Sequence, residues 1–470
     1  MRKRPTHSPS GSALLMTLFF SSLFLIMFGA TLSFIMVQHK AVAYEVYRAQ
    51  GTSIAEAGTN YYRWHLAHDP EDFTTDTGTH HYTDPYGGVF GTYTLTVEAP
   101  TSGQTTAVIT SAGSPQESPN VESRIRVRYG KQSLTEYAFL TNSNVWFGST
   151  EKIKGKIHSN GGIRMDGISD SLVTSAVESY ICGPEQGCTN EVKPGVWGSG
   201  ENPKFWKYPV QTVDFHSFSV DLENLKNEAI AGGIYLGDSG SYGYFLEFHN
   251  KGTLTISSVT TVYPAVNAYD GTSWITVAND KKTWTALSGY TNIPLPSNGL
   301  IFLEDDTWVS GVVTGHATVV AARLPDGSYP WADIYIPNSL NYTGHDGADE
   351  LGVIAQDDVL IPLRSDDTLD LNGAILAING HVMRYYYSQS KKDPYKTYAL
   401  RDTIKIYGSI ISNGFWTWSW VSSDTGPVTS GYNYTDTKYD PNLTYNPPPY
   451  FPTENEYSFI SWEELERNQE

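Results

Sequence analysis

The chain has 470 residues, 13% of them aromatic, and a formal net charge of −19. This acidity argues against a nucleic-acid binder, which presents a basic face. The aromatic content argues against disorder for most of the chain, and the length allows more than one folded unit.

A long apolar stretch follows a short basic leader. Arg2, Lys3 and Arg4 precede Ala13 to Val37, a run without Asp, Glu, Lys, Arg or His. About 20 apolar residues suffice to cross a bilayer as a helix. The positive-inside bias predicts a cytoplasmic N-terminus and an exported remainder.

The helical pattern continues beyond this span. Ile54, Ala57, Tyr61 and Trp64 keep the three- and four-residue steps of one apolar helix face. Pro70 disfavours helical geometry at Asp69. The pattern therefore predicts a single helix over 12–68, roughly 85 Å long.

The order of these features resembles a known family. Gly11, the small residue Ser12, the apolar span and the stretch Ala55-Glu56-Ala57-Gly58 are similar to type IV pilins, and more closely to PilX-type minor pilin-like proteins. The resemblance implies that a prepilin peptidase cuts between Gly11 and Ser12. A plain signal anchor and a signal peptide are the alternatives, although the apolar run exceeds the 7–15 residues of a signal peptide.

One position departs from the family pattern. The fifth residue of the processed chain, usually Glu in major pilins, is Met16 here. In lacking this glutamate, the chain resembles the minor pseudopilin that is thought to occupy the fibre tip. It implies a place at the end of a fibre rather than in its shaft.

Short strands are expected next. Phe90–Ala99, Thr106–Thr110 and Val121–Tyr129 alternate apolar and polar residues, and turn residues separate them. These three segments predict an antiparallel meander.

A repeated motif then dominates the chain. Gly155 to Gly161 (GKIHSNG) recurs as Gly408 to Gly414 (GSIISNG), with looser relatives at Gly373 to Gly380 and Gly311 to Gly315. Short β-branched runs between Gly, Asn and Asp indicate stacked rungs that bury their apolar faces only against each other. We therefore expect a right-handed β-helix, with a β-sandwich as the alternative. This block also resembles exported pilus-associated proteins that carry such a domain after a PilX-like N-terminus.

Two smaller features interrupt the repeats. Cys182 and Cys188 are the only cysteines, and a disulfide closing their small loop is expected in an oxidising compartment. Ser217–Ala231 has helical spacing, with Ser219 as a possible N-cap and Gly232-Gly233 as the stop.

The fold class is therefore expected to be mainly β with a long N-terminal helix. The expected order is a leader (1–11), a transmembrane and pilin-like helix (12–68), a linker and meander (69–140), first solenoid rungs with the cysteine loop (141–212), a helix and β insertion (213–299), a β-solenoid (300–422) and a C-terminal tail (423–470).

Paired carboxylates raise the question of catalysis. The pairs are Asp305-Asp306, Asp357-Asp358 and Asp366-Asp367. Hydrolysis of a polysaccharide needs two carboxylates about 5–9.5 Å apart, but adjacent strand residues point to opposite faces. The simplest interpretation is that these doublets occupy turns. Calcium could bind turns that are rich in carboxylate oxygens. No other cofactor or metal is expected.

An aromatic cluster suggests recognition. On a straight strand, Trp416, Trp418 and Trp420 would share one face. Such a face could bind a surface glycan or a protein, or the strand could instead cap an open end of the solenoid.

The combined expectation is a non-enzymatic, low-copy minor pilin-like subunit. It would have a single membrane pass with a cytoplasmic N-terminus, and it would join a cell-surface or secretion fibre. Its partners would be other pilin or pseudopilin subunits, the inner membrane and a glycan or protein ligand. The alternatives are a membrane-anchored β-helix enzyme acting on polysaccharide and an envelope scaffold or adhesin.

Overall fold

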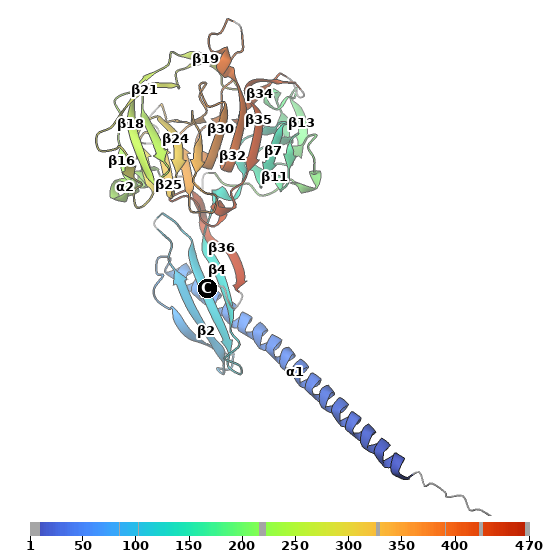
Figure 1. The fold of residues 1–470 in the computed structure, drawn as a ribbon. Helices are drawn as coiled ribbons and strands as arrows, with labels where there is room; N and C mark the ends of the chain where they lie inside the picture. Colours follow the sequence, from blue (N-terminus) through green and yellow to red (C-terminus); the bar gives the residue numbers. More distant parts are fainter. Residues whose placement is uncertain are drawn as a thin grey trace, which may run out of the picture. The chain divides into compact units, whose positions relative to one another are not determined.

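A computed structural model describes residues 10–83, 85–101, 103–215, 222–325, 330–390, 392–422 and 426–465. The chain forms two units (Figure 1). The first comprises the residues up to Ala99, Ala107–Tyr129 and the stretch from Ser461 onward. The second comprises Pro100–Thr106 and Gly130–Ile460.

The first unit is built on one helix and one sheet. Helix α1 runs from Ser10 to His68 and ends just ahead of Asp69-Pro70, as expected. The sheet has the order β1-β2-β3-β4-β36, and β1, β2, β3 and β4 pair antiparallel in succession. The strands are β1 (Gly78–Thr83), β2 (Val89–Glu98), β3 (Ala107–Pro115), β4 (Ser123–Ser133) and β36 (Thr453–Leu465).

The second half of α1 packs closely on this sheet. Ile54, Ala55 and Tyr62 are fully buried and share a core with apolar residues of β2, β3 and β4. A β-carbon at Gly58 would lie 2.8 Å from Cδ2 of Tyr93 and would overlap the Ser111 hydroxyl. The Ala-Glu-Ala-Gly stretch therefore supplies the small residues that let helix and sheet approach.

The second unit is a solenoid of parallel strands, so the β-sandwich alternative is wrong. Its three faces are called A, B and C. Face A contains β16 (Ile234–Leu236), β23 (Leu300–Leu303), β25 (His316–Ala321), β28 (Glu350–Ala355), the second halves of β30 (Thr368–Ala377) and β32 (Leu400–Ser412), β5 (Phe139–Thr141), β8 (Ile157–Ser159), β11 (Val173–Ser175) and β15 (Trp206–Lys207).

Faces B and C complete each rung. Face B contains the start of β24 (Thr307–Val313), β26 (Ile334–Tyr335), β29 (Val359–Leu360), β31 (Val382–Met383) and β33 (Trp416–Thr417), and a separate parallel trio of β6 (Val145–Phe147), β9 (Ile163–Met165) and β14 (Val196–Trp197). Face C contains the end of β24, β27 (Leu340–Tyr342), the first halves of β30 and β32, β35 (Val428–Lys438), β7 (Glu151–Lys154) and β10 (Ile168–Ser169).

Further strands and short helices complete the unit, and these strands pair antiparallel, except that β17 (Tyr244–His249) also pairs parallel with β24. They are β12 (Ser179–Cys182), β13 (Glu191–Pro194), β17 (Tyr244–His249), β18 (Thr253–Val262), β19 (Val266–Tyr269), β20 (Trp274–Val277), β21 (Lys281–Ala286), β22 (Ile293–Pro294), β34 (Ser419–Val421), α2 (Leu222–Gly232), α3 (Lys396–Ala399), and the 3₁₀ turns η1 (Leu134–Glu136), η2 (Pro184–Gln186), η3 (Pro203–Phe205) and η4 (Pro441–Thr444). Helix α2 matches the expected helix, but Ser219 lies outside the described residues.

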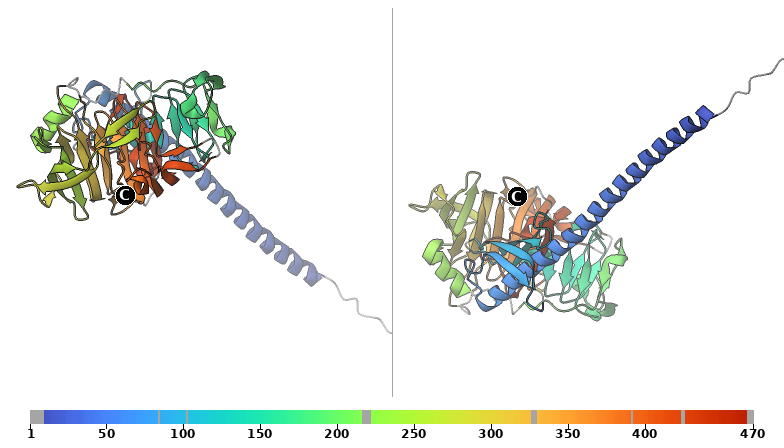
Figure 2. Two further views of the ribbon diagram at one scale, coloured as in Figure 1. Left: turned by 90° about the horizontal axis from the view of Figure 1, so that it is seen from above. Right: turned by 90° about the horizontal axis from the view of Figure 1, so that it is seen from below.

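The rungs do not stack in sequence order. The last strand of face A in chain order, β32, pairs with the first, β5, so that Ile410 lies beside Phe139. On face C, β35 pairs with β7 in the same way. We call these two pairings the seam. The chain therefore forms its first rungs in the middle of the solenoid, at β5, and continues to one end, at β15. It then crosses to the other end, at β16, and its later strands return to the middle, at β32. Figure 2 shows these later, orange and red strands between the green ends.

The repeated Asn-Gly motif forms one corner of the solenoid. Asn160 donates to Asn142 at 2.8 Å, and Asn142 donates to Asn413 at 2.9 Å across the seam. His158 contacts Asn160 and Thr174 at 3.1 and 2.9 Å, and burial lowers its pKa. The motif thus stacks side-chain amides from rung to rung.

Two of the three faces are covered by other parts of the unit. Apolar side chains of face A share a core with Leu225 of α2, Leu443 of η4 and Phe451. Face B shares a core with residues of β18 and β19, among them Val259 and Ala268. Face C differs, because side chains such as Tyr434 point outward and are exposed.

The C-terminal stretch is not the tail that the sequence suggested. Strand β35 completes the last rung and pairs with both β32 and β7. Strand β36 joins the sheet of the first unit beside β4. A Pro-rich segment, Pro447 to Pro452, separates them and packs on face A through Phe451.

Candidate functional site: the apolar helix and the solenoid surfaces

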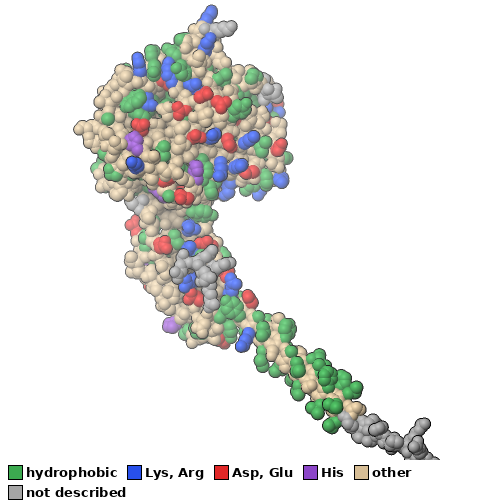
Figure 3. All heavy atoms as spheres, viewed as in Figure 1, with side chains coloured by type: hydrophobic (Ala, Val, Ile, Leu, Met, Phe, Trp, Pro, Cys, Tyr) green, Lys and Arg blue, Asp and Glu red, His purple; other side chains and the backbone are tan. Residues whose placement is uncertain are grey.

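The first half of α1 is an exposed apolar rod. Its most apolar window has a mean hydropathy of 2.2 over 18 residues, and none of that window is buried. Figure 3 shows hydrophobic side chains along this part of α1. The helix is long and apolar enough to cross a membrane.

Three hydroxyl groups of the rod are satisfied within the helix. The hydroxyl of Thr17 donates to the carbonyl oxygen of Ala13 at 3.0 Å, and those of Ser22 and Thr31 donate to carbonyl oxygens of the preceding turn. Hydrocarbon offers no other partners to such groups. These three hydroxyl groups can therefore enter an apolar environment already paired.

The residues singled out for processing lie at the start of the rod. Gly11 and Ser12 fall within α1, and the side chain of Met16 is 65% exposed among other apolar side chains. A glutamate at that position would place a charge in the span, which is costly unless a partner neutralises it.

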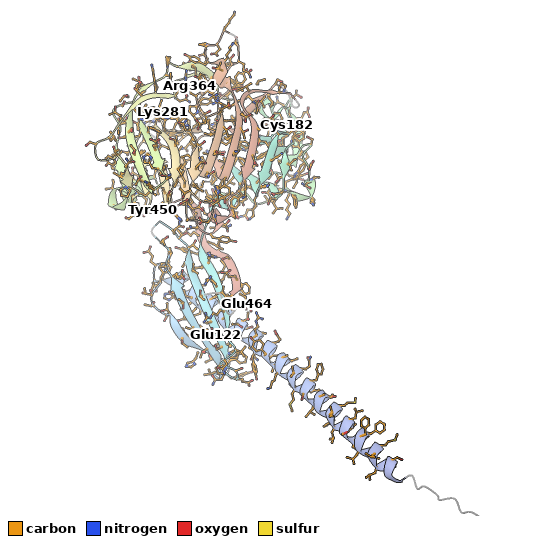
Figure 4. The ribbon with its side chains drawn as sticks, in the orientation of Figure 1. Glu122, Cys182, Lys281, Arg364, Tyr450 and Glu464 are labelled. Carbon is orange, nitrogen blue, oxygen red and sulfur yellow. A yellow bond between two sulfur atoms is a disulfide. The ribbon has the colours of Figure 1, made fainter. Side chains whose placement is uncertain are left out.

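Ion pairs connect α1 and β4 to the C-terminal strand. Arg48 of α1 lies 3.0 Å from Glu464 of β36, and Arg126 of β4 lies 3.7 Å from Glu463. Figure 4 labels Glu464 beside the helix. Exposed pairs of this kind each contribute at most about 1 kcal/mol, so they orient β36 more than they stabilise it.

The two cysteines are joined. The Cys182–Cys188 disulfide closes the β12–β13 hairpin around η2, and its S–S distance is 2.02 Å. The Arg164 guanidinium donates to the Gln186 carbonyl in this loop at 2.7 Å and pairs with Asp166 at 2.7 Å. The disulfide thus closes a loop of the second unit.

The tryptophan cluster does not form a recognition face. Trp416 and Trp418 are buried, at 4% and 1% exposure, and the Trp416 ring stacks on Phe139 at 4.5 Å across the seam. Trp420 is half-buried, and its indole donates to the Arg384 carbonyl at 3.0 Å. The strand is interrupted at Trp418, between β33 and β34, so the side chains do not alternate as they would on a straight strand. The cluster fills the seam and caps no open end.

The aspartate doublets belong to a ladder at one solenoid corner. Asp306 accepts the backbone N–H of Asp333 at 3.1 Å, Asp333 accepts that of Asp358 at 3.1 Å, and Asp358 accepts that of His381 at 2.6 Å. The sequence separations of 27, 25 and 23 residues follow the rungs. This spacing is the signal through which Asp333, absent from the sequence-based candidates, could have been found.

Burial and neighbouring charges shift the pKa values of the carboxylates in this ladder. Burial raises the pKa of Asp306, and Arg323 lies 3.0 Å from its carboxylate. Burial, together with Asp306 and Asp358, raises the pKa of Asp333 well above its usual range.

Two of the remaining doublet carboxylates, those of Asp305 and Asp366, also bond to groups that are 18 and 27 residues away in the sequence. Asp305 accepts from Arg323 at 2.6 Å, and Asp366 accepts the backbone N–H of Ser339 at 3.0 Å. Among the described residues, no group of three or more His, Cys, Asp or Glu side chains is placed to hold a metal ion.

The comparisons with known proteins give a distant structural likeness. The crystal structure of the competence-associated pilin ComZ from Thermus thermophilus aligns with 89% of this chain and 97% of its own, at 13% identity and a TM-score of 0.27. A TM-score this low does not establish a shared fold. No protein-family model and no curated protein matches the chain.

Proposed function

We propose that this chain is a non-enzymatic, membrane-anchored, pilin-like subunit of a type IV pilus or a related secretion fibre, with the solenoid as a head displayed outside the cell. One observation carries the proposal. A single helix, Ser10–His68, is an exposed apolar rod in its first half and the packing partner of a small antiparallel sheet in its second.

The continuity of α1 favours a fibre subunit over a plain anchor. A plain anchor needs only about 20 apolar residues and gains nothing from a rigid continuation. Here the helix runs without a break into the close contact at Gly58. Such a helix can leave the bilayer side by side with the helices of other subunits while its sheet remains outside.

Two features favour a low copy number at the end of the fibre. The head, about ten rungs at roughly 4.8 Å each, is near 50 Å long, and copies of that length conflict with close helix packing along a shaft. Met16 also removes the glutamate that, in the resembling family, registers an incoming subunit against its neighbour.

Processing provides the first test. Mass spectrometry of the chain purified from membranes should show Ser12 as the N-terminal residue, and Gly11→Val should retain the leader and leave the protein out of sheared fibres. Ser10→Ala is the matched control and should be processed normally. An intact N-terminus at Met1, or cleavage well after Val37, would contradict the proposal.

Location provides the second test. Gold-labelled antibody against the 300–420 region should mark fibre ends, and quantitative mass spectrometry should find few copies per fibre. Even labelling along shafts would refute the end location, whereas normal fibres in a deletion strain with a damaged envelope would favour the scaffold alternative.

A further inference from the structure

Face C is the open face of the solenoid. Its outward side chains form two rows that run along the solenoid axis from strand to strand. The alternating row is Asp370, Lys405, Asp436 and Lys152, and the lysine row is Asn372, Tyr407, Lys438 and Lys154. Figure 3 shows basic and acidic side chains interspersed on the side where Figure 1 places β30, β32, β35 and β7.

The charges of the alternating row compensate one another. Lys405 lies between Asp370 and Asp436 in register, and its ammonium is 3.9 Å from the Asp370 carboxylate. Lys152 follows Asp436 on the next strand. Opposite charges on neighbouring strands stabilise a sheet, so this row needs no external partner.

The lysine row is different. Lys438 and Lys154 are direct neighbours across the seam, about 4.8 Å apart at the backbone. Both side chains are exposed, and among the described residues neither forms an ion pair. Like charges placed directly side by side destabilise a sheet. An anion bound between the two ammonium groups would remove that repulsion.

An aromatic side chain lies on the same face. Tyr434 precedes Asp436 and Lys438 on β35 with the same outward orientation, and it is 62% exposed. An exposed aromatic ring offers an apolar surface on which a sugar ring can stack. Tyr407, in the lysine row, is half-buried, donates its hydroxyl to Asp440 at 3.0 Å and lies 5.2 Å from the Lys438 ammonium.

We propose that face C binds an acidic polysaccharide, with uronate carboxylates on Lys154 and Lys438 and a sugar ring on Tyr434. A linear chain of about three sugars that runs along β35 reaches from the lysine pair to Tyr434, which lies four residues or about 13 Å from Lys438 on the same strand. A membrane surface fits poorly, because its many anions would meet both Asp370 and Asp436, whereas a single polymer chain along β35 passes only Asp436. The net charge of −19 repels polyanions elsewhere on the chain, so binding is local to this face.

The test uses the full chain in detergent and three uronate polymers, polygalacturonate, alginate and hyaluronate, with dextran as the neutral polymer. We expect at least one uronate polymer to bind, more weakly as ionic strength rises, and dextran not to bind. Lys154→Gln with Lys438→Gln should weaken binding about tenfold while leaving the fold intact, since it removes a like-charge contact. Tyr434→Ala should weaken binding without changing its salt dependence.

The matched control replaces two exposed lysines outside face C, Lys251→Gln with Lys396→Gln, and changes the net charge equally. Its affinity should stay within about twofold of the parent, well under 1 kcal/mol. The proposal is overturned if no uronate polymer binds or if the control loses as much affinity as the double variant. It is also overturned if vesicles with anionic lipid bind as well as the polymer and lose binding in the same variant.

Discussion

Replacing Trp416 by Ala should open the seam. The indole is 4% exposed, and its ring lies 4.5 Å from that of Phe139 and 5.1 Å from that of Phe147, both on the other side of the seam. A buried Trp→Ala change costs about 3–5 kcal/mol, and each aromatic pair adds roughly 0.5–1.5. The indole N–H has no hydrogen-bond partner among the described residues, which offsets part of that loss. We therefore expect a loss of about 4 kcal/mol.

The expected change in Tm follows from the size of the second unit. Unfolding entropy is about 2.1 cal/mol/K per residue, so in this unit each kcal/mol corresponds to roughly 1.5 °C. Scanning calorimetry of the full chain in detergent should show Trp416→Ala lowering the Tm by about 6 °C. Trp416→Phe, which keeps an aromatic ring and removes the unpaired N–H, should cost less than about 1.5 kcal/mol.

Hydrogen exchange shows where the loss occurs. Amides of β5 and β7 should exchange faster in Trp416→Ala, whereas those of β25 and β28, away from the seam, should change little. The exposed Trp274, at 61%, is the control, and its replacement by Ala should leave Tm nearly unchanged. Equal Tm shifts for the two variants, or exchange raised evenly over all rungs, would refute the role of Trp416 in the seam.

Three further predictions concern other parts of the chain. Gly58→Val should disrupt the contact between α1 and its sheet by about 1–3 kcal/mol, seen as faster proteolysis of the first unit, whereas Gly29→Val, with nothing within 4 Å, should not. Burial raises the pKa of Glu151 from 4.5 to about 7, so the carboxyl binds its proton more tightly in the folded state. Its stabilising contribution is complete below pH 4.5 and is lost as the pH rises to about 7, and Glu151→Gln should flatten that part of the Tm–pH curve. Replacing Cys182 and Cys188 by Ser should cost about 2 kcal/mol, as expected for so short a loop, and should expose the β12–β13 hairpin to protease, whereas unchanged cleavage would show that the hairpin is held without the bridge.

Local patterns were sufficient to predict the long helix and the stacked rungs. The uncharged run Ala13–Val37 and the apolar steps beyond it are properties of one helix, and α1 has the expected end. The Asn-Gly repeats predicted stacked rungs, and Asn160 and Asn413 do lie at one corner, where each is hydrogen-bonded to Asn142. In both cases the information lies within a few residues of the element that it specifies.

The order of the rungs could not be predicted in this way. Repeats indicate that segments stack, but not which segment lies next to which, and the pairing of Ile410 with Phe139 depends on packing across the whole unit. The burial of Trp416 and Trp418 was missed for a related reason. Side chains alternate with a period of two only along a straight strand, and here the strand is interrupted at Trp418, between β33 and β34.

The position of β36 and the seam has a consequence for folding during synthesis. The first unit lacks its fifth strand until residues 453–465 have been made, and the solenoid cannot close until β32 and β35 reach β5 and β7. A chain interrupted before that point leaves strand edges open in both units, and open edges invite aggregation. Completion of both units therefore depends on the final segment of the chain, so a truncated product is left with neither unit finished.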